Sequence, residues 1–147
     1  MKNKILIGIF VLLTSISSAF ANGKEEVNER IIKSFEKEFA GAQNVQWLTT
    51  KDFVKVTFIL NEQVVYAFYE QNGNLLGVTR NIVSGQLPIS LLTDLKKNYS
   101  THWITDLFEM ASNHENVYYV TLENSDQKLV LKSNGTTGWE VFRKERK

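Results

Sequence analysis

The residues that could carry out chemistry are few in this chain, and their spacing argues against a shared metal site. His102 and His114 are its two histidines, and they flank the apolar run Trp103–Met110. As an extended strand at about 3.3 Å per residue, that run would hold the two rings roughly 35 to 40 Å apart. The rings are then too distant to bind one metal ion, and we expect both to be solvent-exposed turn residues.

Acidic residues offer a second candidate, a calcium site, and the pattern does not favour it. The acids that could form it all lie in the second half of the chain, and they are Asp106, Glu109, Glu115, Glu123 and Asp126. None belongs to the aspartate-rich loop with a glycine that calcium-binding loops use. The sequence also has no glycine-x-serine-x-glycine elbow, phosphate-binding glycine loop or zinc-binding histidine pair. We therefore expect no enzymatic activity, no metal and no cofactor.

Aromatic side chains are the more informative set. Tyr66 and Tyr69 lie on opposite faces of one expected strand, and Tyr118 and Tyr119 on opposite faces of another. Because a helix covers only one face of a sheet, some aromatic residues should lie on the open face, where they are typical of binding interfaces. The residues predicted to contact a partner are Tyr69, Tyr119, Trp103 and Trp139. Packing in the core is the alternative for each of them, and it is the favoured interpretation for Trp47.

The elements that would position these residues alternate between helical and strand periodicity. Apolar residues three to five apart predict an amphipathic helix from Lys24 to Phe39, which Gly41 ends. A second helix is expected from Pro88, at its first position, to about Ser100. Strands are expected over 44–48, 53–60, 64–69 and 75–80, and again over 103–110, 117–123, 128–132 and 139–143.

The two halves of the chain therefore share one order of elements. The turn signals Asn72-Gly73 and Asn134-Gly135 lie 62 residues apart, each before the last strand of its half. An ancestral duplication explains this agreement, and chance similarity between α+β segments is the alternative. We predict an α+β fold of tandem helix-plus-four-strand repeats, about 24–82 and about 87–144, with the helices on one face of an antiparallel sheet.

The N-terminal segment has the features of a secretory signal peptide. Lys2 and Lys4 precede an apolar run that leads to the cleavage signal Ala19-Phe20-Ala21. The apolar run is shorter than the roughly 20 residues that a bilayer span needs, so a membrane anchor is the less favoured alternative. We expect removal of residues 1–21 and export of the domain 22–147 to the periplasm or the medium, without stable insertion in a membrane.

The composition excludes several classes of protein. The chain has 147 residues, of which 43% are hydrophobic, and its net charge is +1, or −1 once Lys2 and Lys4 are removed. It is too apolar to be disordered and too evenly charged to bind nucleic acid through bulk charge. Cysteine is absent. The core must therefore hold without disulfides, which favours a bacterial exported domain over a small eukaryotic extracellular one.

Several of these segments resemble a known family. The junction Phe39-Ala40-Gly41-Ala42-Gln43-Asn44-Val45-Gln46-Trp47, with Tyr66–Leu75, Leu87-Pro88 and Tyr118–Leu122 after it, resembles the exported PepSY-like domains of Bacteroidota. The resemblance covers essentially the whole chain after residue 21. It implies a fold like that of the β-lactamase inhibitor protein (BLIP), with an open, concave sheet face. BLIP contains disulfides and this chain has no cysteine, so its contact residues are not transferred.

These observations favour a binding protein over an enzyme. We expect an exported, non-enzymatic binding or inhibitor-like module that holds a protein or peptide on the open sheet face through aromatic side chains. The alternative is a structural or envelope-associated domain that assembles through a sheet edge. Inhibition of a peptidase or a β-lactamase does not follow from the shared shape.

Overall fold

The structure is a computed structural model that describes residues 27–112 and 115–147. The predicted signal peptide, residues 1–21, lies outside the described residues, as do the first residues of the expected N-terminal helix and His114. Within the described part, no helix is both long enough and apolar enough to cross a bilayer.

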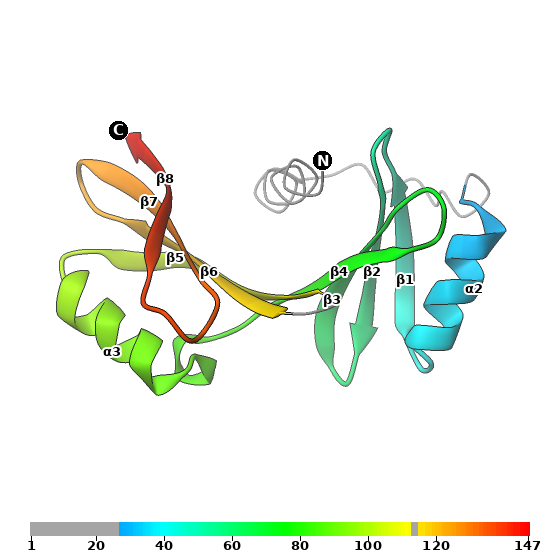
Figure 1. Cartoon of the computed structure of the whole chain (residues 1–147), viewed down its shortest axis with the longest axis horizontal. Coiled ribbons are helices and arrows are strands. Elements are labelled where there is room, and N and C mark those ends of the chain that lie inside the picture. Colours follow the sequence, from blue (N-terminus) through cyan, green and yellow to red (C-terminus); the bar gives the residue numbers. More distant parts are fainter. Residues whose placement is uncertain (1–26, 113–114) are drawn as a thin grey trace. The chain divides into compact units, whose positions relative to one another are not determined.

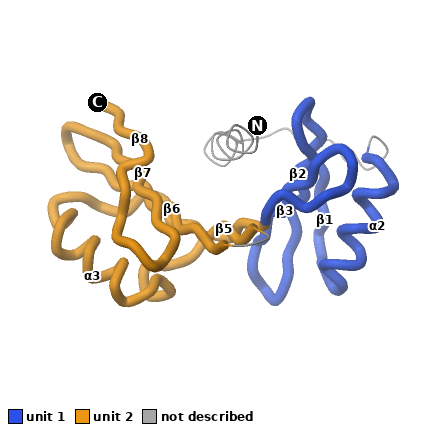
Figure 2. The backbone as a smooth tube through the Cα atoms, in the orientation of Figure 1, with its two compact units in different colours: residues 1–77 blue, residues 78–147 orange. Residues whose placement is uncertain are grey.

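Among the described residues, two α-helices and eight strands follow one another in the predicted order, α2 and β1 to β4, then α3 and β5 to β8 (Figure 1). The strands form one antiparallel sheet in chain order from β1 to β8. The predicted α+β class and antiparallel sheet are therefore confirmed. The chain divides into two compact units, unit 1 up to Gly77 and unit 2 from Val78 onward (Figure 2).

Unit 1 contains the first of the two described α-helices and the strands that follow it. Its elements are α2 (Glu29–Glu38), β1 (Gln43–Thr49), β2 (Val54–Leu60), β3 (Gln63–Tyr69) and the start of β4 (Leu75–Asn81). The side chain of Asn28 accepts a hydrogen bond from the backbone N–H of Arg30 at 2.9 Å. This bond caps α2, because it satisfies one of the N–H groups that have no partner within the helix.

Aromatic packing holds α2 against one face of these strands. Phe35 of α2 contacts Trp47 of β1 with ring centroids 5.2 Å apart, and Phe58 of β2 with centroids 5.0 Å apart, both edge to face. Such pairs contribute about 0.5–1.5 kcal/mol each beyond their buried area. Residues that alternate with Phe58 along β2 point away from α2. Cross-strand pairing then defines the α2-distal face of unit 1, which carries Leu48, Lys55, Thr57, Tyr66 and Phe68.

Unit 2 contains the second helix and the remaining strands. After the end of β4 its elements are the 3-10 helix η2 (Ser84–Gln86), α3 (Ile89–Asn98), β5 (Trp103–Ser112), β6 (Glu115–Glu123), β7 (Gln127–Ser133) and β8 (Glu140–Arg146). Pro88 is the residue before α3, with an extended ψ of 137°, and not its first helical residue. The last strand begins after Trp139, because that side chain packs against the core beside α3.

The core of unit 2 lies between α3 and one face of its strands. Leu91 and Leu95 of α3 pack with Leu107, Val120 and Leu131 of the sheet, all of them buried. The residues that alternate with these along the strands point the other way. They form the α3-distal face of unit 2, which carries Trp103, Phe108, Tyr119, Thr121 and Val130.

The two predicted asparagine-glycine turns occupy equivalent places in the two units. Gly73 lies between β3 and β4 with φ +97°, and Gly135 lies between β7 and β8 with φ +86°. In each turn the preceding asparagine, Asn72 or Asn134, accepts a hydrogen bond from a backbone N–H two residues on. Glycine is favoured at both positions because other residues rarely adopt positive φ.

Lys55 is buried on the face that α2 does not cover. It alternates along β2 with the apolar Val54 and Val56, yet only 7% of the residue is exposed. The reason lies in its neighbours, because Phe68 is directly opposite on β3 and the ring of Tyr66 lies 4.5 Å from the Lys55 Nζ. The α2-distal face thus buries the Lys55 cation beside aromatic rings.

Candidate functional site

Aromatic rings form a cluster on the α3-distal face. Phe108 of β5 and Tyr119 of β6 are a cross-strand pair, and their rings stack with centroids 5.1 Å apart and an interplanar angle of 17°. Phe142 of β8 meets Tyr119 edge to face at 5.6 Å. Phe108 and Tyr119 are buried, whereas Phe142 is 37% exposed. Burial raises the pKa of the Tyr119 hydroxyl, and the nearby Glu115 carboxylate raises it further.

Trp103 lies at another part of the same face and is its most exposed aromatic residue. It pairs with Glu123 across β5 and β6, and 54% of it is exposed. The Nζ of Lys147 lies 5.4 Å from the centre of the indole ring, within the range of a cation–π contact. The Lys147 ammonium thus lies between an aromatic face and a carboxylate, because it also pairs with Glu123 at 2.8 Å.

Glu123 forms ion pairs with the lysines near Trp103. Besides Lys147, its carboxylate pairs with Lys128 at 3.6 Å, and the Thr105 hydroxyl donates to it at 3.4 Å. The hydrogen bond from Lys147 is the main cause that lowers the pKa of Glu123, and the two ammonium charges act in the same direction. Asp106 on β5 behaves differently, because burial raises the pKa of its carboxyl. The α3-distal face therefore combines aromatic rings, which are enriched in binding interfaces, with charges of both signs.

The four residues predicted to contact a partner occupy three different environments. Tyr69 is wholly buried and lies on the α2 side of unit 1, where its hydroxyl donates to Glu38 of α2 at 3.3 Å. Trp139 is partly buried against the α3 core, and its ring N–H donates to the carbonyl of Leu91 at 3.0 Å. Neither lies on a helix-distal face, so their expected placement was wrong. Tyr119 and Trp103 do lie on the α3-distal face, and of these two only Trp103 is exposed.

Tyr69 and Trp139 were misplaced for a physical reason. Alternation along a strand separates two faces, but it does not say which face the helix covers. For Tyr69 the register settles the matter, because it pairs with Val54, on the α2 side of the sheet. Trp47 is buried edge to face against Phe35, as the packing interpretation required.

His102 is not the exposed turn histidine that the sequence predicted. It is half-buried, with its Nε2 3.0 Å from the side-chain amide nitrogen of Asn124 and 3.2 Å from that of Gln127. Its Nδ1 lies 3.2 Å from the Thr101 hydroxyl. These contacts tie the start of β5 to the turn between β6 and β7, which is a structural use of the ring.

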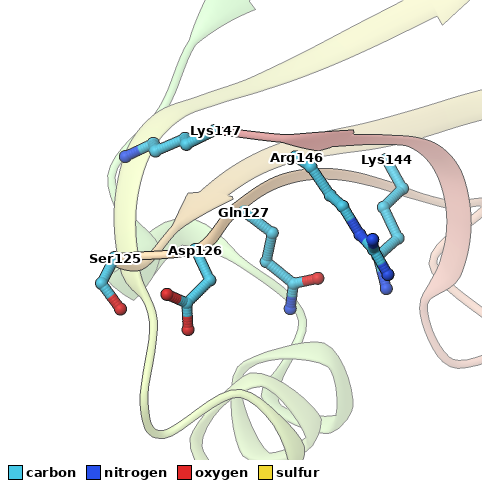
Figure 3. A pocket seen from close by; sticks show the side chains of 6 residues that line it. All are labelled: Ser125, Asp126, Gln127, Lys144, Arg146 and Lys147. Atoms are coloured by element: carbon cyan, nitrogen blue, oxygen red, sulfur yellow. The ribbon is translucent and has the colours of Figure 1, made fainter.

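A polar pocket of about 480 Å³ lies where β7 begins and β8 ends. Figure 3 shows its lining side chains, which are Ser125, Asp126, Gln127, Lys144, Arg146 and Lys147. In this view the side chains of Lys144 and Arg146 point the same way, with the amide of Gln127 beside them. Of the candidate residues considered from the sequence only Asp126 lines this pocket, and none of the four residues predicted to contact a partner does.

Sequence reasoning missed Phe108 and Phe142 as members of the aromatic cluster. Phe108 could have been found, because it follows Leu107 in an expected strand and therefore points to the opposite face. Phe142 could not, because the register between β7 and β8 shifts between Val130 and Leu131. Such an irregularity changes which residues share a face, and periodicity gives no sign of it.

No family model and no curated protein matches the sequence. Solved structures of Bacteroides proteins do match the fold. A protein from B. eggerthii that is provisionally assigned to the periplasm has a TM-score of 0.72 at 10% identity, over 82% of this chain and 88% of its own. A DUF2874 family protein from B. uniformis has a TM-score of 0.72 at 11% identity, over 82% and 89% of the two chains.

The third structure identifies the type of fold. A BLIP-like protein from B. fragilis has a TM-score of 0.70 at 16% identity and covers 82% of this chain and 86% of its own. Identities this low establish the fold alone. The implied BLIP-like fold is therefore confirmed, and membership of the PepSY-like family stays a prediction.

Proposed function

We propose that this chain is an exported, non-enzymatic module that binds a protein or peptide partner on the α3-distal face of unit 2. One observation carries the proposal: Trp103 and Phe142 are half-exposed on the sheet face that α3 does not cover. Rigid aromatic side chains of this kind supply much of the binding energy in protein interfaces. The buried pair Phe108 and Tyr119 lies beneath Phe142 and would hold its ring in place.

The comparisons support this proposal at the level of fold and compartment. A BLIP-like neighbour is compatible with binding or inhibition through a sheet surface, and a neighbour provisionally assigned to the periplasm agrees with the predicted signal peptide. We further propose that the chain is a PepSY-like domain built by tandem duplication. The repeated order of helix and four strands, with an asparagine-glycine turn before the last strand of each half, supports the duplication.

Affinity capture from periplasmic extract of the source bacterium tests the proposed function. The baits are residues 22–147 as wild type, Trp103→Ala, Phe142→Ala and Ile89→Ala. Ile89 is the matched control, because it is 82% exposed but lies on α3. We expect wild type and Ile89→Ala to retain the same partner. A hot-spot loss of about 2 kcal/mol would weaken its binding roughly thirtyfold in Trp103→Ala.

Two results would contradict the proposal. One is equal recovery of every partner by all four baits, and the other is loss of the partner in Ile89→Ala but not in Trp103→Ala. Near-ultraviolet circular dichroism of each variant checks that tertiary packing is retained.

Assembly through a sheet edge is the second candidate function, and β8 favours it. This strand ends the sheet, and all seven of its residues are exposed, including the apolar Val141. An exposed edge presents backbone groups that can pair with another strand. Sedimentation velocity over a hundredfold range of concentration tests this candidate, and a sedimentation coefficient that does not change with concentration would rule out self-assembly through β8.

A further inference from the structure

Lys55 is a buried cation without a carboxylate partner among the described residues. Only 7% of the residue is exposed, and none of the ion pairs in the described part of the chain includes it. Burying a charge is costly unless a counter-charge or hydrogen bonds replace the lost water. A buried lysine near the start of β2 therefore needs a reason.

Aromatic rings replace part of the stabilisation that water would give the Lys55 ammonium. The Lys55 Nζ lies 4.5 Å from the centre of the Tyr66 ring and 6.0 Å from that of Phe68, which is itself fully buried. Phe53 packs edge to face on Phe68 at 5.7 Å and fixes that ring. Cation–π contacts offset only part of the cost, since burial still lowers the pKa of the Lys55 ammonium.

Part of the surroundings of Lys55 is accessible to solvent. Lys55 belongs to the α2-distal face, where it pairs with Leu48 on β1 and Phe68 on β3. Its neighbours Leu48, Thr57 and Tyr66 are partly exposed, so they are not fully enclosed. A ligand that approaches this face would meet apolar carbon and aromatic edges around a single positive charge.

We propose that Lys55 is a binding residue for a carboxylate group of a peptide or protein, either a C-terminal carboxylate or an aspartate or glutamate side chain. A carboxylate at this position would form a charge-assisted hydrogen bond with the ammonium in apolar surroundings, where such bonds are strong. The adjacent apolar part of the ligand would pack on Leu48 and Tyr66. This site lies in unit 1 and does not depend on the proposed function of the α3-distal face.

Three synthetic tripeptides, all N-acetylated, test the proposal and separate the two sources of the carboxylate. The first is alanine-leucine-alanine with a free C-terminus, the second is alanine-glutamate-alanine amide, and the third is the neutral alanine-glutamine-alanine amide. Each is titrated into 15N-labelled residues 22–147, and the backbone amide shifts of Leu48, Thr57 and Tyr66 are followed.

Variants decide whether Lys55 carries the binding. Lys55→Met keeps an apolar side chain of similar length and removes the charge. Lys55→Arg keeps the charge, so it distinguishes the loss of the charge from a defect in folding. Lys51→Met is the matched control, because Lys51 is exposed in the turn before β2. We expect at least one carboxylate peptide to give saturable shifts, with affinity at least about tenfold weaker in Lys55→Met and unchanged in Lys51→Met. Lys55→Arg should retain binding.

Three results would overturn the inference. They are saturation by neither carboxylate peptide, equal shifts with the neutral peptide, and unchanged affinity in Lys55→Met. Because Trp103 and Phe142 lie in the other unit, substituting them should leave these titrations unchanged, so the two proposals fail independently.

Discussion

The two units differ in what their helix-distal faces carry, although each packs one helix on the opposite face. In unit 1 the Lys55 ammonium is buried beside the rings of Tyr66 and Phe68, and no carboxylate among the described residues pairs with it. In unit 2 the rings of Trp103 and Phe142 are half-exposed, and the nearby lysines pair with Glu123. The same order of elements therefore supports two chemically different surfaces. The fold alone does not identify a function, because proteins of only 10–16% identity share it.

Matched core substitutions should give the largest effects and should separate the two units. Phe35→Ala removes a ring buried against Trp47, and Leu91→Ala removes a side chain buried under α3. We expect losses of about 3–5 and 2–5 kcal/mol in the free energy of unfolding, because each leaves a cavity. In hydrogen exchange the first should affect β1 to β3 most, and the second β5 to β7. Identical exchange patterns would show that the two cores do not respond separately.

The two asparagine-glycine turns allow a direct comparison of the units. Gly73→Ala places a Cβ 3.3 Å from the Cβ of Arg30, and Gly135→Ala places one 3.1 Å from the ring of Tyr118. Each also forces alanine into positive φ, which costs about 1–2 kcal/mol. Gly41→Ala is the control, because its φ is +91° but no atom lies within 4 Å of the new Cβ. Urea denaturation should show larger losses at 73 and 135 than at 41, and equal losses at all three would exclude a steric contribution.

The pH dependence of stability should distinguish Lys55 from the paired lysines. Its pKa is lowered from 10.5 by burial, so the folded chain binds this proton less readily than the unfolded chain. The charge therefore destabilises the folded protein at neutral pH, and the penalty is lost as the pH rises toward 10.5. Lys55→Met should raise the Tm at pH 7, with a smaller gain at pH 10. A variant that is less stable than wild type at pH 7 would contradict this account.

The ion pairs around Glu123 should contribute least to the stability of the folded protein. Glu123→Gln removes pairs with Lys147 and Lys128, and its effect on stability should be small and vanish at about 0.5 M salt. The matched control is Glu145→Gln, because Glu145 pairs with Arg143 in a more exposed position. Thermal unfolding at low and high salt checks both, and a loss that persists at high salt would mean that Glu123 has another structural role.

Much of the fold could be predicted from the sequence because its local signals agree with one another. The alternation of Val54, Val56 and Phe58 fixes one face of β2, and the turns at Gly73 and Gly135 fix where strands reverse. These are properties of neighbouring residues, so they can be read without knowing the rest of the molecule.

The candidate sites could be predicted only in part, because they depend on contacts between strands. Tyr69 lies under α2 and not on the opposite face, a distinction that alternation alone cannot make. Lysine is rarely buried, so strand periodicity does not reveal the burial of Lys55, which becomes evident only from the positions of Tyr66 and Phe68. Trp103 does lie on a face that no helix covers in the described part of the chain, and 54% of it is exposed.

Site-specific photo-crosslinking in living cells tests the central proposal, binding on the α3-distal face, most directly. A photoreactive phenylalanine analogue is placed at Trp103 in one strain and at Ile89 in another. We predict that position 103 crosslinks to a discrete partner and that position 89, on α3, does not. Adducts of equal yield at both positions, or at Ile89 alone, would contradict binding on this face.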